Sequence, residues 1–279
     1  MKKCFFIVIM TCMCAMFWTT GCTNGKPATD SLGVDSIVDT TLNADTLEQL
    51  VEEQPMPVAA DELFDDFIFN FASSHKLQLK RIKFPLLVSG EEKRTISKNE
   101  WKTDHFFMEQ GYYSLFFNSE KQLDIVKDTS VNNVVVEKIN LETKSFSDYV
   151  FKRIHGAWML VSLHKGDLEQ HPNASFLNFY HKFATDASFQ QHSLNDPVQF
   201  SGPDPDDDFA TLTGDIAPET WPAFAPELPS GHLYNIVYGH NTVKGNQKIF
   251  LMRGISNGME MQLTFKRIGG DWKLVKLSE

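Results

Sequence analysis

The sequence has no cysteine after residue 22, although its first 22 residues contain four. The rest of the chain therefore has neither a disulfide nor a thiolate metal site. A basic excess is also absent, because the formal charge is −10 and no stripe of lysine or arginine offsets it. An acidic surface repels nucleic-acid phosphates and anionic lipid headgroups. We therefore expect no nucleic-acid partner.

The common catalytic and metal-binding motifs are missing as well. The sequence contains no His-Glu-x-x-His, no Cys-x-x-Cys, no Gly-x-Ser-x-Gly and no glycine-rich phosphate-binding loop. We therefore assign no catalytic residue, no metal and no cofactor from the sequence.

The first 21 residues have the pattern of a secretory signal peptide. Lys2 and Lys3 precede an apolar run over 4–18, and small residues lead into Cys22. Thr-Thr-Gly-Cys is similar to the lipobox of bacterial lipoproteins, although Thr19 stands where leucine is commoner. We expect lipidation of Cys22 and a membrane anchor. The open alternative is an ordinary cleaved signal followed by an unmodified cysteine.

The segment that follows predicts a tether. Residues 22–58 are rich in Asp, Glu, Thr and Ser and contain no aromatic residue. Such a segment cannot bury enough apolar surface to offset the entropy of ordering. The expected location is the cell envelope, as an outer membrane lipoprotein on its periplasmic or surface-exposed face.

The remaining chain contains an internal repeat. Residues 61–90 match 173–202 without a gap at a shift of 112, including the pairs Gln78/Gln190 and Pro85/Pro197. Residues 151–163 and 265–277 share nine of thirteen positions at a shift of 114. Two co-linear matches with nearly equal shifts indicate duplication. We expect two domains, at 59–168 and 173–279.

Each repeat predicts helices followed by strands. Apolar residues at helical spacing indicate a first helix after Asp61 and another after Asn173, both good N-caps. Strands are expected over 112–117, 134–141, 147–154 and 157–163, and tight turns at His155-Gly156 and Gly269-Gly270. The fold class is therefore α+β: two tandem cone-like domains, each with N-terminal helices on a curved antiparallel sheet.

These features resemble the nuclear transport factor 2-like (cystatin-like cone) superfamily. The resemblance rests on the Phe-rich first helix, the short second helix with its glutamine, the proline before a strand, and the closing Phe-Lys-Arg-Ile-x-Gly-x-Trp-x-Leu-Val hairpin. More narrowly, they resemble tandem-domain lipoproteins of uncharacterised function from anaerobic gut bacteria. The resemblance covers about 61–279 and implies a curved sheet around helices, with a pocket in the cone. The superfamily contains isomerases, dehydratases and pure binding modules, so the fold alone does not select a function.

The duplication tests for a shared active site. In the segments that align well, the two repeats share no His, Asp or Glu, which general acid–base catalysis requires. Duplication has therefore preserved a fold, and either one repeat has its own site or neither is an enzyme. The shared charges are Lys152-Arg153 and Lys266-Arg267. Each arginine is expected to be a solvated strand residue or, as the alternative, an anion ligand.

Aromatic residues supply the other site candidates. A proline-rich segment at 203–231 contains Trp221 and Phe224, and predicts either a recognition loop or a Trp221 packed on the sheet, as Trp101 is in the first repeat. Tyr234 and His240 are candidates for a pocket mouth in the second repeat. The similar set in the first repeat is Trp101, Tyr112 and Tyr113. For all of these, the alternative is a core position or an exposed turn.

The function expected from these features is a membrane-anchored, non-enzymatic binding or interaction module. Two linked modules raise the avidity for a repetitive ligand such as a glycan. A small molecule or a protein is an equally open ligand. The alternatives are an isomerase- or dehydratase-type enzyme in one cone, and a purely structural envelope protein.

Overall fold

The computed structural model describes residues 63–90, 93–239 and 245–279. All of them belong to one compact unit, Leu50–Glu279. The predicted signal peptide, Cys22, the tether over 22–58 and His240 lie outside the described residues. Within the described part of the chain, no helix has the length and apolar character needed to cross a membrane.

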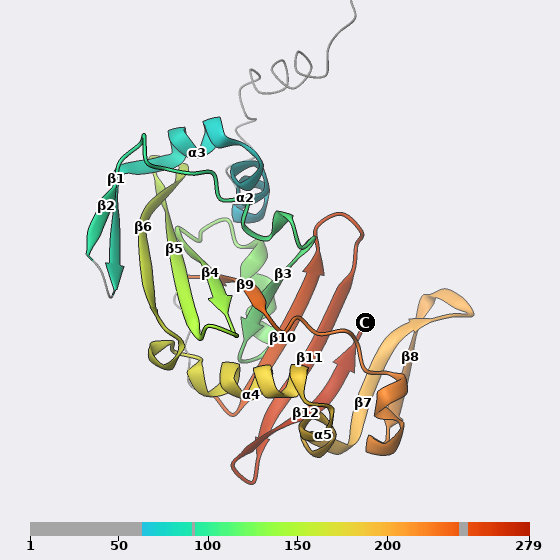
Figure 1. Cartoon of the computed structure of the whole chain (residues 1–279). Coiled ribbons are helices and arrows are strands. Elements are labelled where there is room, and N and C mark those ends of the chain that lie inside the picture. Colours follow the sequence, from blue (N-terminus) through green and yellow to red (C-terminus); the bar gives the residue numbers. More distant parts are fainter. Residues whose placement is uncertain (1–62, 91–92, 240–244) are drawn as a thin grey trace, which may run out of the picture. The chain divides into compact units, whose positions relative to one another are not determined.

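The first sequence repeat folds into helices followed by strands (Figure 1). Its elements are α2 (Phe64–Ser73), α3 (His75–Arg81), β1 (Ile82–Gly90), β2 (Arg94–Ile96), η2 (Phe106–Met108), β3 (Tyr112–Phe117), η3 (Glu120–Lys127), β4 (Asn133–Asn140), β5 (Ser145–Ile154) and β6 (Ala157–Asp167).

The second repeat has nearly the same order of elements. They are η4 (Leu168–Gln170), α4 (Ala174–Thr185), α5 (Ala187–His192), β7 (Leu194–Asp204), β8 (Asp207–Ile216), η5 (Pro218–Ala223), β9 (His232–Tyr238), β10 (Gln247–Gly254), β11 (Glu260–Ile268) and β12 (Asp271–Ser278). The strand β8 and the short helix η5 occupy most of the proline-rich segment, for which a recognition loop was one of the two alternatives.

The structure confirms several local predictions and corrects others. The expected strand at Tyr112–Phe117 is β3, and the turns after β5 and β11 have positive φ at His155, Gly156, Gly269 and Gly270. Helix α2 begins later than expected, because its N-cap is Leu63. Pro85 and Pro197 lie within β1 and β7, since α3 and α5 end before them.

The strands form one continuous sheet. Its order is β2-β1-β6-β5-β4-β9-β3-β10-β11-β12-β7-β8. Strand β9 of the second repeat therefore pairs with β4 of the first, and β3 of the first repeat pairs with β10 of the second. Each repeat contributes one strand to the other's side of the sheet. Separate sheets for the two expected domains are not observed.

The sheet is mixed, which corrects the expectation of an antiparallel sheet. Three pairs are parallel: β1 with β6, β7 with β12, and β3 with β9. Parallel neighbours require a long connection. In the first two pairs, the segment that connects the two strands is almost as long as a whole repeat. A sequence pattern that predicts hairpins between neighbouring strands therefore did not reveal these parallel pairs.

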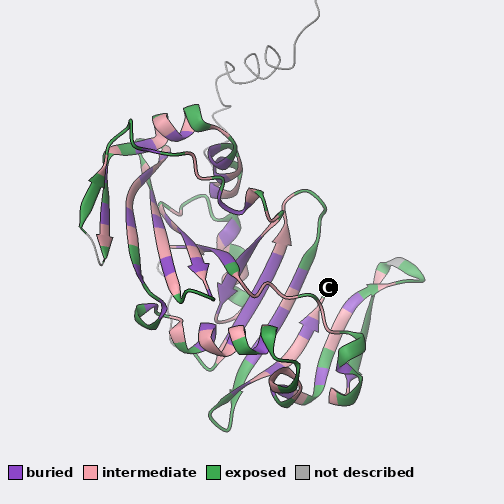
Figure 2. Ribbon diagram, viewed as in Figure 1, coloured by how far each residue is buried: buried purple, intermediate pink, exposed green. Residues whose placement is uncertain are grey.

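Both faces of the central strands are buried (Figure 2). Alternate residues of β3 point to opposite faces. Leu115 packs in a cluster with α2 residues such as Phe67, whereas Phe116 packs in a second cluster with α4 residues such as Phe176. Helices α2 and α4 thus cover opposite faces, and the same alternation places Ser114 on the α4 face.

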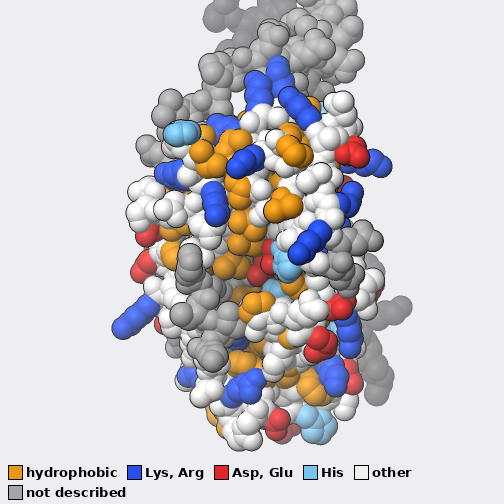
Figure 3. Space-filling model, turned by 90° about the vertical axis from the view of Figure 1, so that its left-hand side faces the viewer, with side chains coloured by type: hydrophobic (Ala, Val, Ile, Leu, Met, Phe, Trp, Pro, Cys, Tyr) orange, Lys and Arg blue, Asp and Glu red, His pale blue; other side chains and the backbone are white. Residues whose placement is uncertain are grey.

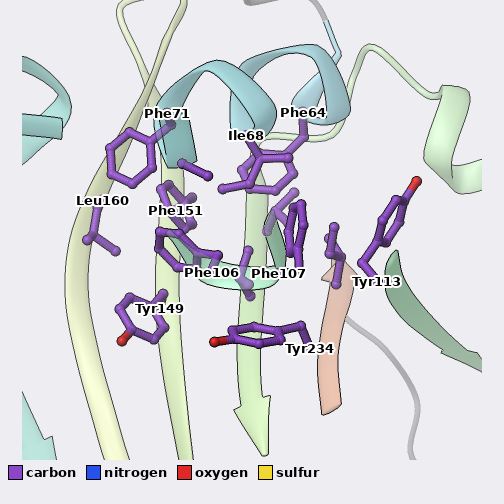
Figure 4. Packing of buried hydrophobic residues seen from close by; sticks show 14 of the residues in the cluster. Phe64, Ile68, Phe71, Phe106, Phe107, Tyr113, Tyr149, Phe151, Leu160 and Tyr234 are labelled. Atoms are coloured by element: carbon purple, nitrogen blue, oxygen red, sulfur yellow. The ribbon is translucent and has the colours of Figure 1, made fainter. Parts of the chain in front are cut away.

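Aromatic rings dominate the cluster beneath α2 (Figure 4). Phe67 is fully buried, and its ring centroid lies 5.3 Å from that of Phe71 and 5.9 Å from that of Phe151. Such pairs add about 0.5–1.5 kcal/mol beyond the burial of their area. The spacing of phenylalanines along α2 thus determines which helix face meets the sheet.

Candidate functional site

The two tryptophans singled out in the sequence lie in the cores. Trp101 is 9% exposed and Trp221 is 1% exposed. The indole Nε1 of Trp101 donates to Gln78 Oε1, and that of Trp221 donates to Gln190 Oε1, each at 2.9 Å. Of the two interpretations given for Trp221, the structure shows the one in which it packs inside, as Trp101 does. The repeated glutamines are therefore structural.

The two candidate tyrosines in the first repeat lie on opposite faces of the sheet. Tyr113 is buried, and its hydroxyl lies 3.5 Å from Asp65 Oδ2. Tyr238 also donates a hydrogen bond to Asp65. Burial, aided by the charge of Asp65, raises the pKa of Tyr113 to about 12. Tyr112 is only partly buried, and packs against the cluster beneath α4.

Tyr234 and Phe224 have different surroundings. Tyr234 lies at the lower border of the cluster in Figure 4, and the Nζ atom of Lys138 is 5.4 Å from its ring centroid. Phe224 is 47% exposed and its ring lies 6.2 Å from that of Phe200. The structure does not bring Trp221, Phe224 and Tyr234 together at one pocket, and none of them lines the cavities described below.

A row of polar side chains crosses the middle of the sheet on the α4 face. The strand register places Asp148 of β5 opposite Glu137 of β4, and Glu137 opposite Asn235 of β9. Asn235 lies opposite Ser114 of β3, so the row joins strands from both repeats. Asn235 Nδ2 donates to Glu137 Oε2 at 2.6 Å, while its Oδ1 accepts from the backbone N–H of Phe116 at 3.0 Å. The amide thus fixes one carboxylate oxygen of Glu137.

His171, in the connection between the repeats, completes this network. It is buried, and its Nε2 lies 3.1 Å from Glu137 Oε1. The backbone N–H of Asn173 donates to His171 Nδ1 at 3.0 Å. Because an N–H can only donate, Nδ1 is the acceptor and Nε2 carries the proton that it donates to Glu137.

Glu137, Asp148 and His171 have the residue types of a metal site. One potential ligand atom from each lies within 4.8 Å of the others. A histidine that binds a metal through Nε2 carries its remaining proton on Nδ1 and donates it to a partner. Here Nδ1 accepts from Asn173, so the arrangement suits a proton on Nε2 better than a metal. We therefore interpret the cluster as a hydrogen-bonded network.

Asp148 is the member of this row whose hydrogen bonding is incomplete. Its Oδ1 is buried and has no hydrogen-bond partner among the described residues. Burial raises the pKa of Asp148 to about 7, and the neighbouring charge of Glu137 acts in the same direction. The row continues on β6 with His164, opposite Asp148. On the β1–β6 side of the molecule, Figure 3 shows histidine and acidic side chains together within a stripe of hydrophobic ones.

Lys248 extends the polar network toward the start of α4. This β10 residue is 5% exposed, and its Nζ donates to Asn118 Oδ1 and Asn173 Oδ1, both at 2.7 Å. Burial lowers the pKa of Lys248 to about 8, although the charge of Glu137 opposes the shift. A buried ammonium group therefore lies beside the connection between the repeats.

Two neighbouring cavities form a groove beside α4. The larger, about 450 Å³, lies among α4, α5 and the β11–β12 turn, and the smaller, about 290 Å³, lies at the start of α4. Both are lined by Ser175, Arg267 and Trp272. The larger is also lined by Phe179, Phe189, His192, Ser193, Asp271 and Lys273. The smaller is also lined by Pro172, Asn173, Phe176, Asn246 and Lys248.

Arg267 is the central polar side chain of the groove. Its guanidinium lies 4.8 Å from the Trp272 ring centroid, and its Nη2 donates to Ser175 Oγ at 2.9 Å. Stacking on an aromatic ring orients a guanidinium without removing its charge. Arg267 is exposed, as expected from the interpretation of this arginine as a solvated strand residue, and it also lines both cavities.

In the first repeat, arginine side chains occupy the place that corresponds to the groove. Arg153 stacks on Trp158 at the same distance of 4.8 Å. At the position aligned with Ser193, however, the first repeat has Arg81. The Nη1 of Arg81 donates to the backbone oxygen of Trp158 at 3.4 Å, and its guanidinium lies 5.8 Å from the ring centroid of Phe67. The small Ser193 leaves a cavity open in the second repeat, whereas the long Arg81 occupies the equivalent space in the first.

The fold defines the class of protein first. A large curved sheet with few helices is the nuclear transport factor 2-like α+β fold, and the structure is similar to that of an NTF2-like protein from Bacteroides fragilis NCTC 9343. The TM-score is 0.74 at 42% sequence identity, covering 80% of this chain and 98% of the other. Residues 43–279 match the family described as a domain of unknown function (DUF4348), and the chain belongs to that family. Among curated proteins, none is significantly similar.

Sequence reasoning missed most residues of the groove and of the buried network. It compared the repeats for shared residues, whereas the groove depends on residues that differ, such as Ser193 against Arg81 and Lys248 against Val134. The difference between Ser193 and Arg81 was visible in the gap-free alignment of 61–90 with 173–202, and it is the signal that would have identified the site.

Proposed function

We propose that this chain is a non-enzymatic binding module of the cell envelope, held at the membrane by a lipid on Cys22, and that it binds a small molecule in the groove beside α4. The observation that carries the proposal is the divergence of the repeats at one position. Ser193 stands beside an open cavity, whereas the aligned Arg81 packs across Phe67 and Trp158.

The size and lining of the groove support a small-molecule ligand. The larger cavity, about 450 Å³, lies within the range of about 300–1,000 Å³ typical of ligand sites. Phe179 and Phe189 supply apolar surface, while Arg267 and Lys273 supply hydrogen-bond donors. Such a combination holds a ligand by its apolar part and orients it through its polar part.

A tandem origin fits the same proposal. We infer that the repeats are copies of one domain that exchanged β3 and β9 while retaining the Gln–Trp contact of each helix pair. Exchange ties the copies into one sheet, so one copy is free to lose its cavity while it still supports the other.

The buried network gives less support to an enzyme. Glu137, Asp148 and His171 are chemically able to transfer protons, but none of them lines either cavity of the groove. A general acid or base must lie within hydrogen-bonding reach of its substrate, directly or through one water.

Filling the groove tests the proposal. Ser193→Arg copies the first repeat, and we expect it to abolish the non-covalent mass that native mass spectrometry detects after exposure to an extract of the producing bacterium. The matched control is Ser188→Arg, which places the same side chain at an exposed position of α5, the helix that ends just before Ser193. Equal ligand retention by both variants, or no bound mass in the unmodified protein, would refute the proposal.

A further inference from the structure

We propose that the two ends of the sheet bind each other in successive copies of this chain, so that the β8 edge of one copy meets the β2 edge of the next. This inference goes beyond the proposed binding function and does not depend on it. It concerns the first and last strands of the sheet order, β2 and β8, each of which has a single neighbouring strand in the described part of the chain (Figure 1).

Strand β8 is a long open edge. It has ten residues, and its ladder runs only to β7. Among the described residues, β8 makes no other hydrogen bond from backbone to backbone. An edge strand of this kind presents a row of unpaired N–H and C=O groups that can pair with a strand of another molecule. Phe209 is fully exposed and Leu212 is 48% exposed, so the edge also carries apolar side chains in contact with water (Figure 2).

Strand β2 forms the opposite edge. It pairs only with β1, and the register places Thr95 opposite Leu87. Leu87 is 53% exposed, so this end also has an apolar side chain in contact with water. Both ends of the sheet therefore have the features of a surface that another strand covers.

The two ends carry opposite charge, although they come from equivalent parts of the two repeats. Residues 187–216, from α5 to the end of β8, contain no Lys or Arg, and their acidic residues are Asp196, Asp204, Asp206, Asp207, Asp208 and Asp215. Residues 75–102, from α3 to the loop after β2, contain only three acidic residues, and their basic residues are Lys76, Lys80, Arg81, Lys83, Lys93, Arg94, Lys98 and Lys102. One end of the sheet is thus acidic and the other is basic.

These charges select which edges can meet. Two β8 edges would place aspartates against aspartates, and two β2 edges would place Lys93 and Arg94 against their own copies. Like charges in such positions are destabilising, whereas a β8 edge and a β2 edge attract each other. The contact is therefore head-to-tail, which joins copies into a ring or an open chain. Such an assembly would repeat the groove beside α4 at regular intervals.

Sedimentation velocity tests for the contact. The full chain, solubilised in a nonionic detergent, is compared at about 50 mM and about 500 mM salt, because salt screens the attraction between exposed charges. We expect species larger than one copy at low salt and single copies at high salt. A chain that stays monomeric at every protein concentration in low salt would overturn the inference.

Charge reversal tests which surfaces meet. One variant reverses the acidic end and the other the basic end, at exposed positions: Asp206→Lys with Asp215→Lys, and Arg94→Glu with Lys98→Glu. Each variant alone should associate at least tenfold more weakly than the unmodified chain, because its two ends then repel each other. An equimolar mixture of the two variants should associate again, since every end of one variant attracts the facing end of the other.

Matched controls reverse two charges of one sign on η3, which lies between the central strands β3 and β4. They are Lys121→Glu with Lys127→Glu, and Glu120→Lys with Asp124→Lys, all at exposed positions. We expect each control to change association less than threefold, and the melting temperature of every variant shows whether it is folded. A mixture of end variants that stays monomeric, or controls that weaken association as strongly as the end variants, would contradict the head-to-tail contact.

Cross-linking decides between head-to-tail and symmetric contacts, even if a charge variant fails to fold. The described residues contain no cysteine, so Thr95→Cys on β2 and Thr213→Cys on β8, both exposed, introduce unique sites for a flexible bismaleimide. The unmodified chain, treated in parallel, accounts for Cys22. We expect cross-linked dimers from a mixture of the two variants and almost none from either alone. Dimers from Thr213→Cys alone, or from Thr95→Cys alone, would show that like edges pair and would overturn the inference.

Discussion

Asp148→Asn should make the stability of the protein less dependent on pH, because it removes a carboxyl that holds a proton in the folded state more tightly than in the unfolded chain. Burial, reinforced by Glu137, raises the pKa of Asp148 from 3.8 to about 7. Between these values the folded state binds a proton that the unfolded chain has released. Stability therefore falls as the pH rises from about 4 to about 7 and is constant above that. A shift of about 3 pH units corresponds to an upper limit of about 4 kcal/mol.

The assay is urea unfolding at several pH values from 4 to 8, at fixed ionic strength. The introduced asparagine side chain resembles the protonated carboxyl in shape, so we expect the variant to match the unmodified protein at pH 4 and to exceed it by up to about 4 kcal/mol at pH 8. Asp167→Asn, at the exposed end of β6, is the control for the loss of a carboxyl as such. A stability difference between Asp148→Asn and the unmodified protein that does not change with pH would refute this reasoning.

Three further predictions concern other parts of the molecule. In urea titrations, Gln78→Leu and Gln190→Leu should each lower the free energy of unfolding by about 1–3 kcal/mol, because each leaves a tryptophan Nε1 without its acceptor. The control Gln199→Leu, at an exposed position, should change it by less than about 0.5 kcal/mol. Zinc and EDTA should give the same melting temperature, because His171 Nδ1 accepts from Asn173; a rise with zinc that Glu137→Gln abolishes would contradict that tautomer. Cys22→Ser should move the protein from the membrane to the soluble fraction, and a variant that remained in the membrane pellet would disprove the lipid anchor.

Local structure was predictable where one physical signal dominates. The phenylalanine spacing of α2 predicted its buried face, and the turn residues at 155–156 and 269–270 predicted the hairpin ends. These features depend on a few neighbouring residues. The α+β class was predictable for the same reason, because each repeat contains helices followed by strands, whereas the single mixed sheet was not.

The order of the strands was not predictable from one sequence. Strands β3 and β9 have similar apolar composition, and either could pair with β4 or β10 by hydrophobic pattern alone. What selects the exchanged arrangement includes polar contacts between distant residues. Asn235 of β9 reaches Glu137 of β4 and accepts from Phe116 of β3, and Ser114 Oγ donates to the Tyr234 carbonyl oxygen at 3.1 Å.

The role of the aromatic candidates was also not predictable from the sequence. A buried tryptophan and a pocket tryptophan have the same sequence pattern, so Trp101 and Trp221 were indistinguishable from ligand contacts until their glutamine partners were located. Trp272, which does line the groove, was not among the candidates selected from the sequence. Whether the tryptophan lines a cavity depends on the residue packed near it, which is Ser193 in the second repeat and Arg81 in the first.

The buried network explains how one groove is maintained by both repeats. His171 lies in the connection between the repeats and Asn173 is the N-cap of α4, and together they link Glu137 on β4 to Lys248 on β10 through successive hydrogen bonds. Strand exchange brings β4 and β10 to opposite sides of the central β9–β3 pair. The connection is therefore fixed at the start of α4 by groups from both repeats. A single unduplicated domain would lack one end of this chain of hydrogen bonds, so both copies together hold the start of α4 in place beside the groove.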